Sequence, residues 1–165
     1  MEKINSLTGM TDLIETKADE NVLANKVFQT EKILKEIFTN YAMSEIRTPA
    51  LENTNLFKRS VGDTSDIVNK ELYTFSDKND KSITLRPEGT ASVMRSIIEK
   101  KLDGETHKFW YLGPMWRYER PQKGRYRQFN QAGIEILGYS EGAPEFEMIS
   151  LICEINRKLQ IRKPL

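Results

Sequence analysis

The sequence predicts an α+β fold in which helices pack on a mostly antiparallel sheet. Residues 72–75 and 83–85 are short apolar runs on either side of the turn-forming stretch 77–80, which is typical of a hairpin. A second pair of strands, joined by a basic loop, is indicated between Lys108 and Gly138. Hairpins join strands that run in opposite directions, so the sheet is expected to be mostly antiparallel. Apolar residues at helical spacing predict helices near residues 19–41, 88–101 and 144–159.

Composition is typical of soluble globular proteins and excludes several other classes. The 165 residues suit one domain with a sizeable core, and 30% charged against 38% hydrophobic residues argues against disorder. The net charge of +1 gives no global basic excess, so any contact with nucleic acid must come from a local patch. The apolar runs are too short to cross a bilayer and the start MEKINSL lacks a signal-peptide pattern, so a cytoplasmic location without membrane association is expected.

The single cysteine and the single histidine limit metal and covalent chemistry. Cys153 excludes an internal disulfide framework and a cysteine-based zinc site, and its neighbours favour a buried structural thiol over a nucleophile. His107 lies at a predicted strand start beside Lys108, where a solvated or capping role is favoured over catalysis. No second histidine supports a metal site, and no metal-binding residue is predicted.

The first fifty residues are expected to form an arm, a long helix and a short strand. Gly9 indicates a turn, so residues 1–17 read as an arm or an edge element. The helix from Asp19 to Tyr41 contains no proline or glycine, and Asp19 can cap its start. Its apolar face packs either on the core or on a partner, and the pattern does not separate these. Residues 44–49 read as a short strand that ends at its proline.

Two further helices are expected on either side of the short hairpin. Residues 54–70 read as a short helix followed by a loop, and a longer helix is expected from Glu88 to Lys101. Glu88 and Thr90 stand at its start, where unpaired backbone amides collect. A helix cap and a ligand contact explain these two residues about equally well. The inward residues of this helix are expected to be Val93, Ile97 and Ile98.

The strands of the second hairpin carry a polar face. Side chains alternate between the two faces of a strand. In the second strand the apolar even positions, expected to face a core, are Ala132, Ile134 and Ile136. The odd positions are Phe129, Gln131, Gly133 and Glu135, and in the first strand Arg117 and Glu119 likewise share a face. Glycine in a strand often marks the close approach of a ligand or another backbone, so this face is a predicted binding site.

Five cations lie within eleven residues on the loop that joins these strands. They are Arg117, Arg120, Lys123, Arg125 and Arg127, with Tyr118 and Tyr126 interleaved. Guanidinium groups offer paired donors to phosphate oxygens, and Phe129 is positioned to stack on a base. A solvated charged hairpin is the alternative interpretation. The polar strand face beside the loop favours a nucleotide or nucleic-acid site.

Four segments, in this order, resemble the histidyl-tRNA synthetases, a family of class II aminoacyl-tRNA synthetases. The helix followed by EIRTPALE is similar to motif 1, at about residues 24–52. LFKRSVGDTSDIVNKELYTF and then LRPEGT resemble two further family segments. RYERPQKGRYRQF resembles motif 2 nearly residue for residue, within a motif 2 region at about 108–138. The resemblance covers essentially residues 1–165 and implies the N-terminal part of a class II synthetase-like catalytic core.

The resemblance implies a histidine–tRNA ligase, which forms histidyl-adenylate from histidine and ATP and then transfers the histidine to tRNA(His). The implied catalytic residue is Arg117, which would hold the α-phosphate and stabilise the charge that develops there. The implied contacts to ATP are Arg117, Glu119, Arg125 and Phe129. The implied contacts to histidine are Glu88, Gly89, Thr90, Arg117, Gln131 and, for the imidazole, Glu135. The implied contacts to the tRNA acceptor end are Arg120, Gln122 and Lys123.

The resemblance also implies Mg²⁺ bridging the ATP phosphates and a homodimer formed through motif 1. The family's third motif and its anticodon-binding domain are absent from these 165 residues, so the chain alone is expected not to aminoacylate. Two alternatives stay open. One is a non-catalytic synthetase-like regulatory subunit of histidine biosynthesis, against which the intact basic loop argues, and the other is a dimerising or RNA-binding module. Asn130 departs from the family, but its parity points away from the site.

Overall fold

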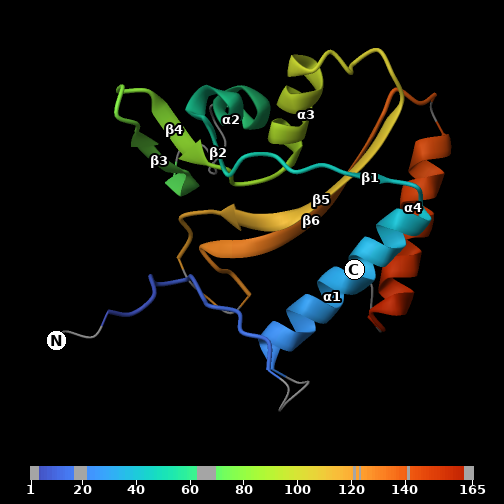
Figure 1. Ribbon diagram of the computed structural model, residues 1–165, viewed down its shortest axis with the longest axis horizontal. Helices are drawn as coiled ribbons and strands as arrows, with labels where there is room; N and C mark the ends of the chain where they lie inside the picture. Colours follow the sequence, from blue (N-terminus) through green and yellow to red (C-terminus); the bar gives the residue numbers. More distant parts are fainter. Residues whose placement is uncertain are drawn as a thin grey trace. The chain divides into compact units, whose positions relative to one another are not determined.

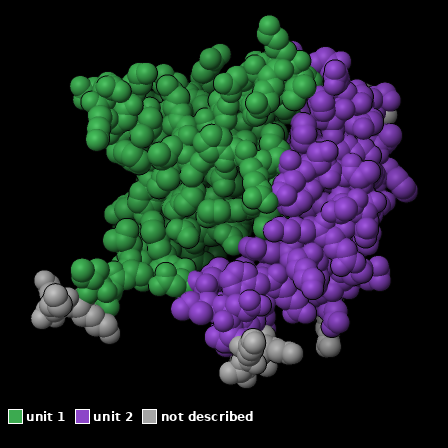
Figure 2. All heavy atoms as spheres, viewed as in Figure 1, with its two compact units in different colours: residues 1–12, 46–102, 111–133 green, residues 13–45, 103–110, 134–165 purple. Residues whose placement is uncertain are grey.

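The structure is a computed structural model, and its described residues form two compact units that Figure 2 colours separately. Unit 1 comprises residues 1–12, 46–102 and 111–133, and unit 2 comprises residues 13–45, 103–110 and 134–165. The residues that the structure describes are 4–16, 22–62, 70–120, 122, 124–140 and 142–161.

Unit 1 contains a three-stranded antiparallel sheet with the order β2–β4–β3. β3 (Tyr73–Ser76) and β4 (Ser82–Leu85) form the hairpin that the sequence predicts, and β2 (Leu51–Asn53) pairs with the other edge of β4. α2 (Thr54–Val61) packs on β2 and β4 (Figure 1). The Asn53 side chain caps α2 by accepting a hydrogen bond from the backbone N–H of Asn55.

α3 (Thr90–Glu99) packs against α2 and completes the core of unit 1. Phe57 of α2 is buried, and Val93 and Ile97 of α3 are buried as their helical spacing predicts. The prediction that Ile98 also faces inward was wrong, because this side chain is 64% exposed. Consecutive residues of a helix are about 100° apart, so Ile98 cannot share the narrow face that Val93 and Ile97 occupy.

Asp77 holds the turn between β3 and β4. Its Oδ1 accepts hydrogen bonds from the backbone N–H groups of Lys81, at 2.9 Å, and Asn79, at 2.8 Å. These two backbone bonds, that of Lys81 first, lower the pKa of the Asp77 carboxyl. The turn that the sequence predicts at residues 77–80 is therefore stabilised most when Asp77 is ionised.

We expect Asp77→Ala to lower the melting temperature of the chain at neutral pH. A carboxyl whose pKa is lowered by folding contributes stability above its unfolded pKa of about 3.9, and loses it as the pH falls through the folded value. Thermal unfolding should therefore show a wild-type advantage that shrinks below about pH 4. Asp103→Ala, at an exposed aspartate, is the matched control. A wild-type advantage that does not change on acidification would contradict this role of Asp77.

Unit 2 pairs α1 (Leu23–Asn40) with α4 (Ala143–Lys158), and Figure 1 shows these two helices side by side. Ile37, Phe38 and Leu151 are buried in this unit. The Phe38 ring stacks on Trp110 with 5.3 Å between the ring centroids. α1 begins four residues later than predicted and has no side-chain cap at Val22, while the predicted cap Asp19 lies outside the described residues.

The second sheet has the order β1–β5–β6. β5 (His107–Trp116) and β6 (Gln128–Leu137) are the two long strands expected on either side of the basic loop, and each contributes residues to both units. β1 is shorter than the predicted strand 44–49, because it contains only Ser44–Glu45. It pairs with β5 in parallel, which is the exception to the antiparallel pattern.

Two predictions of burial were wrong. Cys153 is exposed rather than a buried thiol, because α4 directs Leu151 inward and leaves the following residues outside. Ala132 of β6 is also exposed, and neither Ile134 nor Ile136 is fully buried. β6 is the last strand in the order of this sheet, so alternation alone did not determine which of its faces is covered.

None of the helices in the described ranges has the length and apolarity needed to cross a bilayer.

Candidate functional site

Arg117 brings three sequence segments of unit 1 together directly after β5. Its Nε donates a hydrogen bond of 2.9 Å to the carbonyl of Pro87, in the LRPEGT segment before α3. Its guanidinium carbon lies 5.2 Å from the centroid of the Phe129 ring on β6, within the range of a cation–π contact. The backbone N–H of Arg117 donates to the carbonyl of Arg127 at 2.9 Å. The structure therefore places Arg117 and Phe129 side by side.

Gln131 carries an unpaired acceptor on the same face of β6 as Phe129. Its Oε1 is buried and has no hydrogen-bond partner in the described structure. Buried polar atoms are nearly always paired, so an unpaired one marks a strained site or the place of a missing ligand. Ser92 Oγ and Arg95 Nε, both on α3, have the same property. A donor group of a ligand beside Phe129 would satisfy the amide oxygen of Gln131.

Tyr111 explains two glycines of the predicted site. A Cβ atom built on Gly133 would overlap the Tyr111 ring, and so would one built on Gly89. Tyr111 lies on β5 and is buried. The space beside Gly133, interpreted from the sequence as room for a ligand, is thus filled by a tyrosine side chain. The sequence gives no signal for this contact, because Tyr111 is distant in the chain from both glycines.

Glu88 acts as a helix cap. Its carboxylate accepts hydrogen bonds from the backbone N–H of Thr90, at 2.5 Å, and of Ala91, at 2.9 Å. These are orphan amides of the first turn of α3, so the capping interpretation is confirmed. A contact between Glu88 and the amino group of histidine stays a prediction, as does a contact from the exposed Thr90.

The basic loop after Arg117 turns at Gly124. Gln122 and Arg125 pair through their backbones, and Gly124 between them has a positive φ of 83°. Arg125 forms an ion pair with Glu119 at 3.3 Å. The residues predicted to contact the tRNA acceptor end are Arg120 and Gln122, which are exposed, and Lys123, which lies outside the described residues.

Arg127 differs from the other cations of the loop. Its Nε donates a hydrogen bond of 3.1 Å to the backbone carbonyl of Glu119. Its guanidinium lies 4.2 Å above the ring of Tyr118. The cluster of cations predicted to bind phosphate therefore contains one arginine, Arg127, whose side chain stabilises the loop by contacts with other loop residues.

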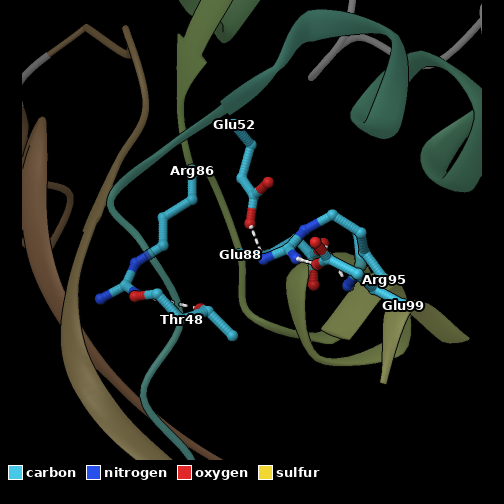
Figure 3. A network of polar contacts seen from close by, with 7 residues as sticks. Thr48, Glu52, Arg86, Glu88, Arg95 and Glu99 are labelled. Carbon is cyan, nitrogen blue, oxygen red and sulfur yellow. Dashed lines mark hydrogen bonds and ion pairs between the residues drawn. The ribbon is translucent and has the colours of Figure 1, made fainter. Parts of the chain in front are cut away.

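Arg86 is a half-buried link that sequence reasoning missed. Its Nη1 donates to the carbonyl of Thr48 at 2.7 Å and to the Thr48 hydroxyl at 3.0 Å, and its Nε donates to the carbonyl of Pro114 at 3.2 Å (Figure 3). Burial lowers the pKa of Arg86. It ties the segment before β2 to the end of β5, next to Arg117. Sequence reasoning could not identify this role, because the partners of Arg86 include backbone carbonyls of residues distant in the chain.

A second polar cluster joins β2 to α3. Arg95 bridges Glu52 at 2.7 Å and Glu99 at 2.6 Å, and the hydrogen bond that Arg95 donates to Glu52 raises the pKa of Arg95 (Figure 3). A cavity of about 1480 Å³ adjoins this cluster. Its lining includes Glu88 and Thr90, but the face formed by Arg117, Phe129 and Gln131 is not part of it. The residues assigned to the nucleotide therefore lie outside the large cavity, while two of the predicted histidine contacts line it.

The imidazole contact of Glu135 and the Mg²⁺ ion are the two remaining expectations. Glu135 follows Gly133 by two positions on β6, is half-buried and belongs to unit 2. Its contact with a substrate imidazole stays a prediction. The described residues contain no group of three or more His, Cys, Asp or Glu side chains that could hold a metal ion. A Mg²⁺ ion that bridges the ATP phosphates stays a prediction.

Solved structures with this fold are synthetases and a synthetase-like protein. The apo histidyl-tRNA synthetase of S. aureus superposes with a TM-score of 0.74 and 38% identity, covering 94% of this chain and 35% of that one. A Bacillus halodurans protein described as an ATP phosphoribosyltransferase regulatory subunit/histidyl-tRNA synthetase superposes with a TM-score of 0.76 at 21% identity, which shows the fold alone. The fold is that of a class II synthetase catalytic domain, as the sequence predicted.

The family follows from sequence comparison. The profile of the histidyl-tRNA synthetase family matches residues 20–164, so the chain belongs to this family. The histidine–tRNA ligase of Geobacter sulfurreducens is 50% identical over 136 residues, which cover 81% of this chain and 33% of that protein. That of Prochlorococcus marinus is 45% identical over 164 residues, which cover 99% of this chain and 37% of that protein. The chain thus spans about a third of the length of these curated relatives.

Proposed function

We propose that this chain forms the motif 1 and motif 2 part of a histidine–tRNA ligase. Histidine and ATP would give histidyl-adenylate and pyrophosphate, and the histidyl group would then pass to the 3′ end of tRNA(His). The observation that supports this most is the face of Arg117, Phe129 and Gln131, where a guanidinium, an aromatic ring and an unpaired buried acceptor lie together. These groups offer contacts to a phosphate, a base and an N–H donor.

Arg117 is the residue assigned to the chemical step. A carboxylate oxygen of histidine forms the new bond to the α-phosphorus, while the bond to the pyrophosphate oxygen breaks. Negative charge grows on the α-phosphate oxygens during this exchange, and a fixed guanidinium stabilises it. The Nε of Arg117 donates a hydrogen bond to the Pro87 carbonyl, and this guanidinium donates no other hydrogen bond within the described residues. The terminal nitrogens of Arg117 are therefore available to the phosphate.

The remaining residues are assigned to binding. Phe129 would stack on adenine, Glu119 and Arg125 would seat the nucleotide, and Gln131 would accept a hydrogen bond from the histidine amino group. The other proposed histidine contacts are Glu88, Gly89, Thr90 and Glu135, the last toward the imidazole. The exposed Arg120 and Gln122, together with Lys123, would meet the tRNA acceptor end. Mg²⁺ would be held by the ATP phosphates and water.

A cytoplasmic homodimer is part of the proposal. The segment Arg47–Pro49 of motif 1 lines the cavity between α2 and α3, together with the exposed Ile98. An apolar and charged concave surface beside motif 1 suits a second copy of the chain. Sedimentation of the chain over a range of concentrations tests this, and a concentration-independent monomer would contradict it.

The regulatory-subunit alternative is not better supported. The protein whose name includes that function is 21% identical to this chain, which establishes a shared fold only. Relatives named histidine–tRNA ligase are 45–50% identical over most of the chain. The paired Glu119 and Arg125 of the intact basic loop also suit nucleotide binding better than amino-acid sensing alone.

The proposal is tested with a chimera in which residues 1–165 replace the matching segment of the G. sulfurreducens ligase. We expect histidine-dependent exchange of pyrophosphate into ATP, which reports the adenylation step alone. The same assay with other amino acids tests selectivity, and charging of tRNA(His) tests the transfer step. A folded chimera that shows no histidine-dependent exchange would contradict the proposed function.

A further inference from the structure

The N-terminal arm of unit 1 is bonded to the base of the basic loop. The carbonyl of Gly9 accepts two hydrogen bonds, from the backbone N–H of Arg127 at 2.8 Å and of Gln128 at 3.1 Å. A bond from the N–H of Met10 to the carbonyl of Leu7, at 3.0 Å, closes a turn around Gly9. Figure 1 shows this arm running beside the connection between β5 and β6.

Gly9 fits this position for two separate reasons. Its φ of 79° lies in the left-handed region, where a residue with a Cβ atom is strained. A Cβ atom there would also lie 2.9 Å from Cγ of Arg127 and 3.1 Å from its backbone nitrogen. Residues 4–8 are exposed, so backbone hydrogen bonds rather than apolar burial hold the arm in place.

Arg127 connects the arm to the proposed catalytic residue. Its N–H is bonded to Gly9, while its carbonyl accepts the 2.9 Å hydrogen bond from the N–H of Arg117. Its guanidinium lies on Tyr118 and holds the carbonyl of Glu119. Arg127 therefore contacts three consecutive residues: it holds the backbones of Arg117 and Glu119, which are assigned to ATP, and the ring of Tyr118.

We propose that the arm, through Gly9, and Arg127 are positioning elements that hold Arg117 and Glu119 in the geometry needed to bind the nucleotide. This inference rests on the proposed function, because it names what prepares the same site. It assigns a role in the site to a segment that precedes motif 1, and it gives Arg127 a role different from that of a phosphate ligand. A displacement of the reacting geometry by about 1 Å can cost up to about 100-fold in rate.

The first test uses the 165-residue chain and compares Gly9→Ala with Gly62→Ala. Gly62 has a similar φ of 89°, but a Cβ atom there would meet no described residue within 4 Å. Both variants place an alanine at a positive φ, so both should lose melting temperature, and Gly9→Ala should lose more because its Cβ atom also meets Arg127. Only Gly9→Ala should weaken binding of a non-hydrolysable histidyl-adenylate analogue in isothermal titration, by about 10- to 100-fold. Equal affinities of the two variants would overturn the inference.

A spectroscopic test separates positioning from stability and from the proposed function. The indole N–H of Trp116 donates to Oε1 of Gln128, the residue next to Arg127, so its NMR resonance reports on the base of the loop. Gly9→Ala should shift this resonance, leave that of Trp110 in place, and speed hydrogen exchange at the amides of Arg127 and Arg117. An unchanged Trp116 signal with unchanged exchange would overturn the positioning role. A wild-type chain that binds no analogue would count against the proposed function, while the NMR result would still decide the positioning.

Discussion

Replacing Arg117 by alanine should lower histidine-dependent pyrophosphate exchange of the chimera by about 10²- to 10³-fold, the usual cost of losing one fixed donor to a developing oxyanion. Arg117 is held by Pro87 and Phe129, so its orientation is set before the substrate arrives. This preorganisation is the reason to expect a large effect on kcat. The Michaelis constant for histidine should change less, because the lost interaction strengthens in the transition state.

The control for this variant is Arg157→Ala, at an exposed arginine on α4. It removes the same charge and leaves the proposed site untouched, so exchange should remain near the wild-type rate. Arg117→Lys provides a second comparison, because a lysine keeps the charge but loses the planar fork of donors. Full exchange activity in Arg117→Ala, with normal folding, would remove Arg117 from the chemical step.

Gly133→Ala should be among the most damaging single-methyl changes in the chain. The added Cβ would overlap the ring of Tyr111. This ring is buried and is also in close contact with Gly89, so it has little room to move. Overpacking of this kind costs about 1–3 kcal/mol of unfolding free energy. The change should also impair analogue binding, because Gly133 lies two residues from Gln131 on the same strand face.

A double-mutant cycle tests the steric explanation of this effect. In a Tyr111→Leu background the ring is absent, so the additional cost of Gly133→Ala should largely disappear. Gly104→Ala is the control, because a Cβ atom at Gly104 would meet nothing within 4 Å. Urea unfolding gives the free energies. Equal costs of Gly133→Ala with and without the Tyr111 ring would contradict the packing described for this residue.

Local patterns were sufficient to predict most elements of the fold, although β2 was not predicted. The β3–β4 hairpin, the long strands β5 and β6 and all four helices follow from alternation, helical spacing and turn residues. The burial of Cys153 and Ala132 was predicted wrongly, because it depends on which neighbours cover a helix or strand face. Periodicity defines such a face but does not identify the element packed on it.

The site was predictable to the extent that its residues share one strand. Parity alone placed Phe129 and Gln131 on one face, and the structure adds Arg117 to them. The contacts that shape the site were not predictable, because they join distant parts of the chain. Tyr111 fills the space beside two glycines, and Gly9 reaches the end of the basic loop from more than a hundred residues away.

The central claim is that the face of Arg117, Phe129 and Gln131 receives histidyl-adenylate, and Gln131→Met tests it most directly. An unpaired buried acceptor costs about 1–3 kcal/mol, and an apolar side chain of similar shape removes that cost. We therefore predict that Gln131→Met raises the melting temperature of the ligand-free chain and weakens binding of the histidyl-adenylate analogue in isothermal titration. A stabilised variant that binds the analogue as tightly as the wild-type chain would contradict the claim.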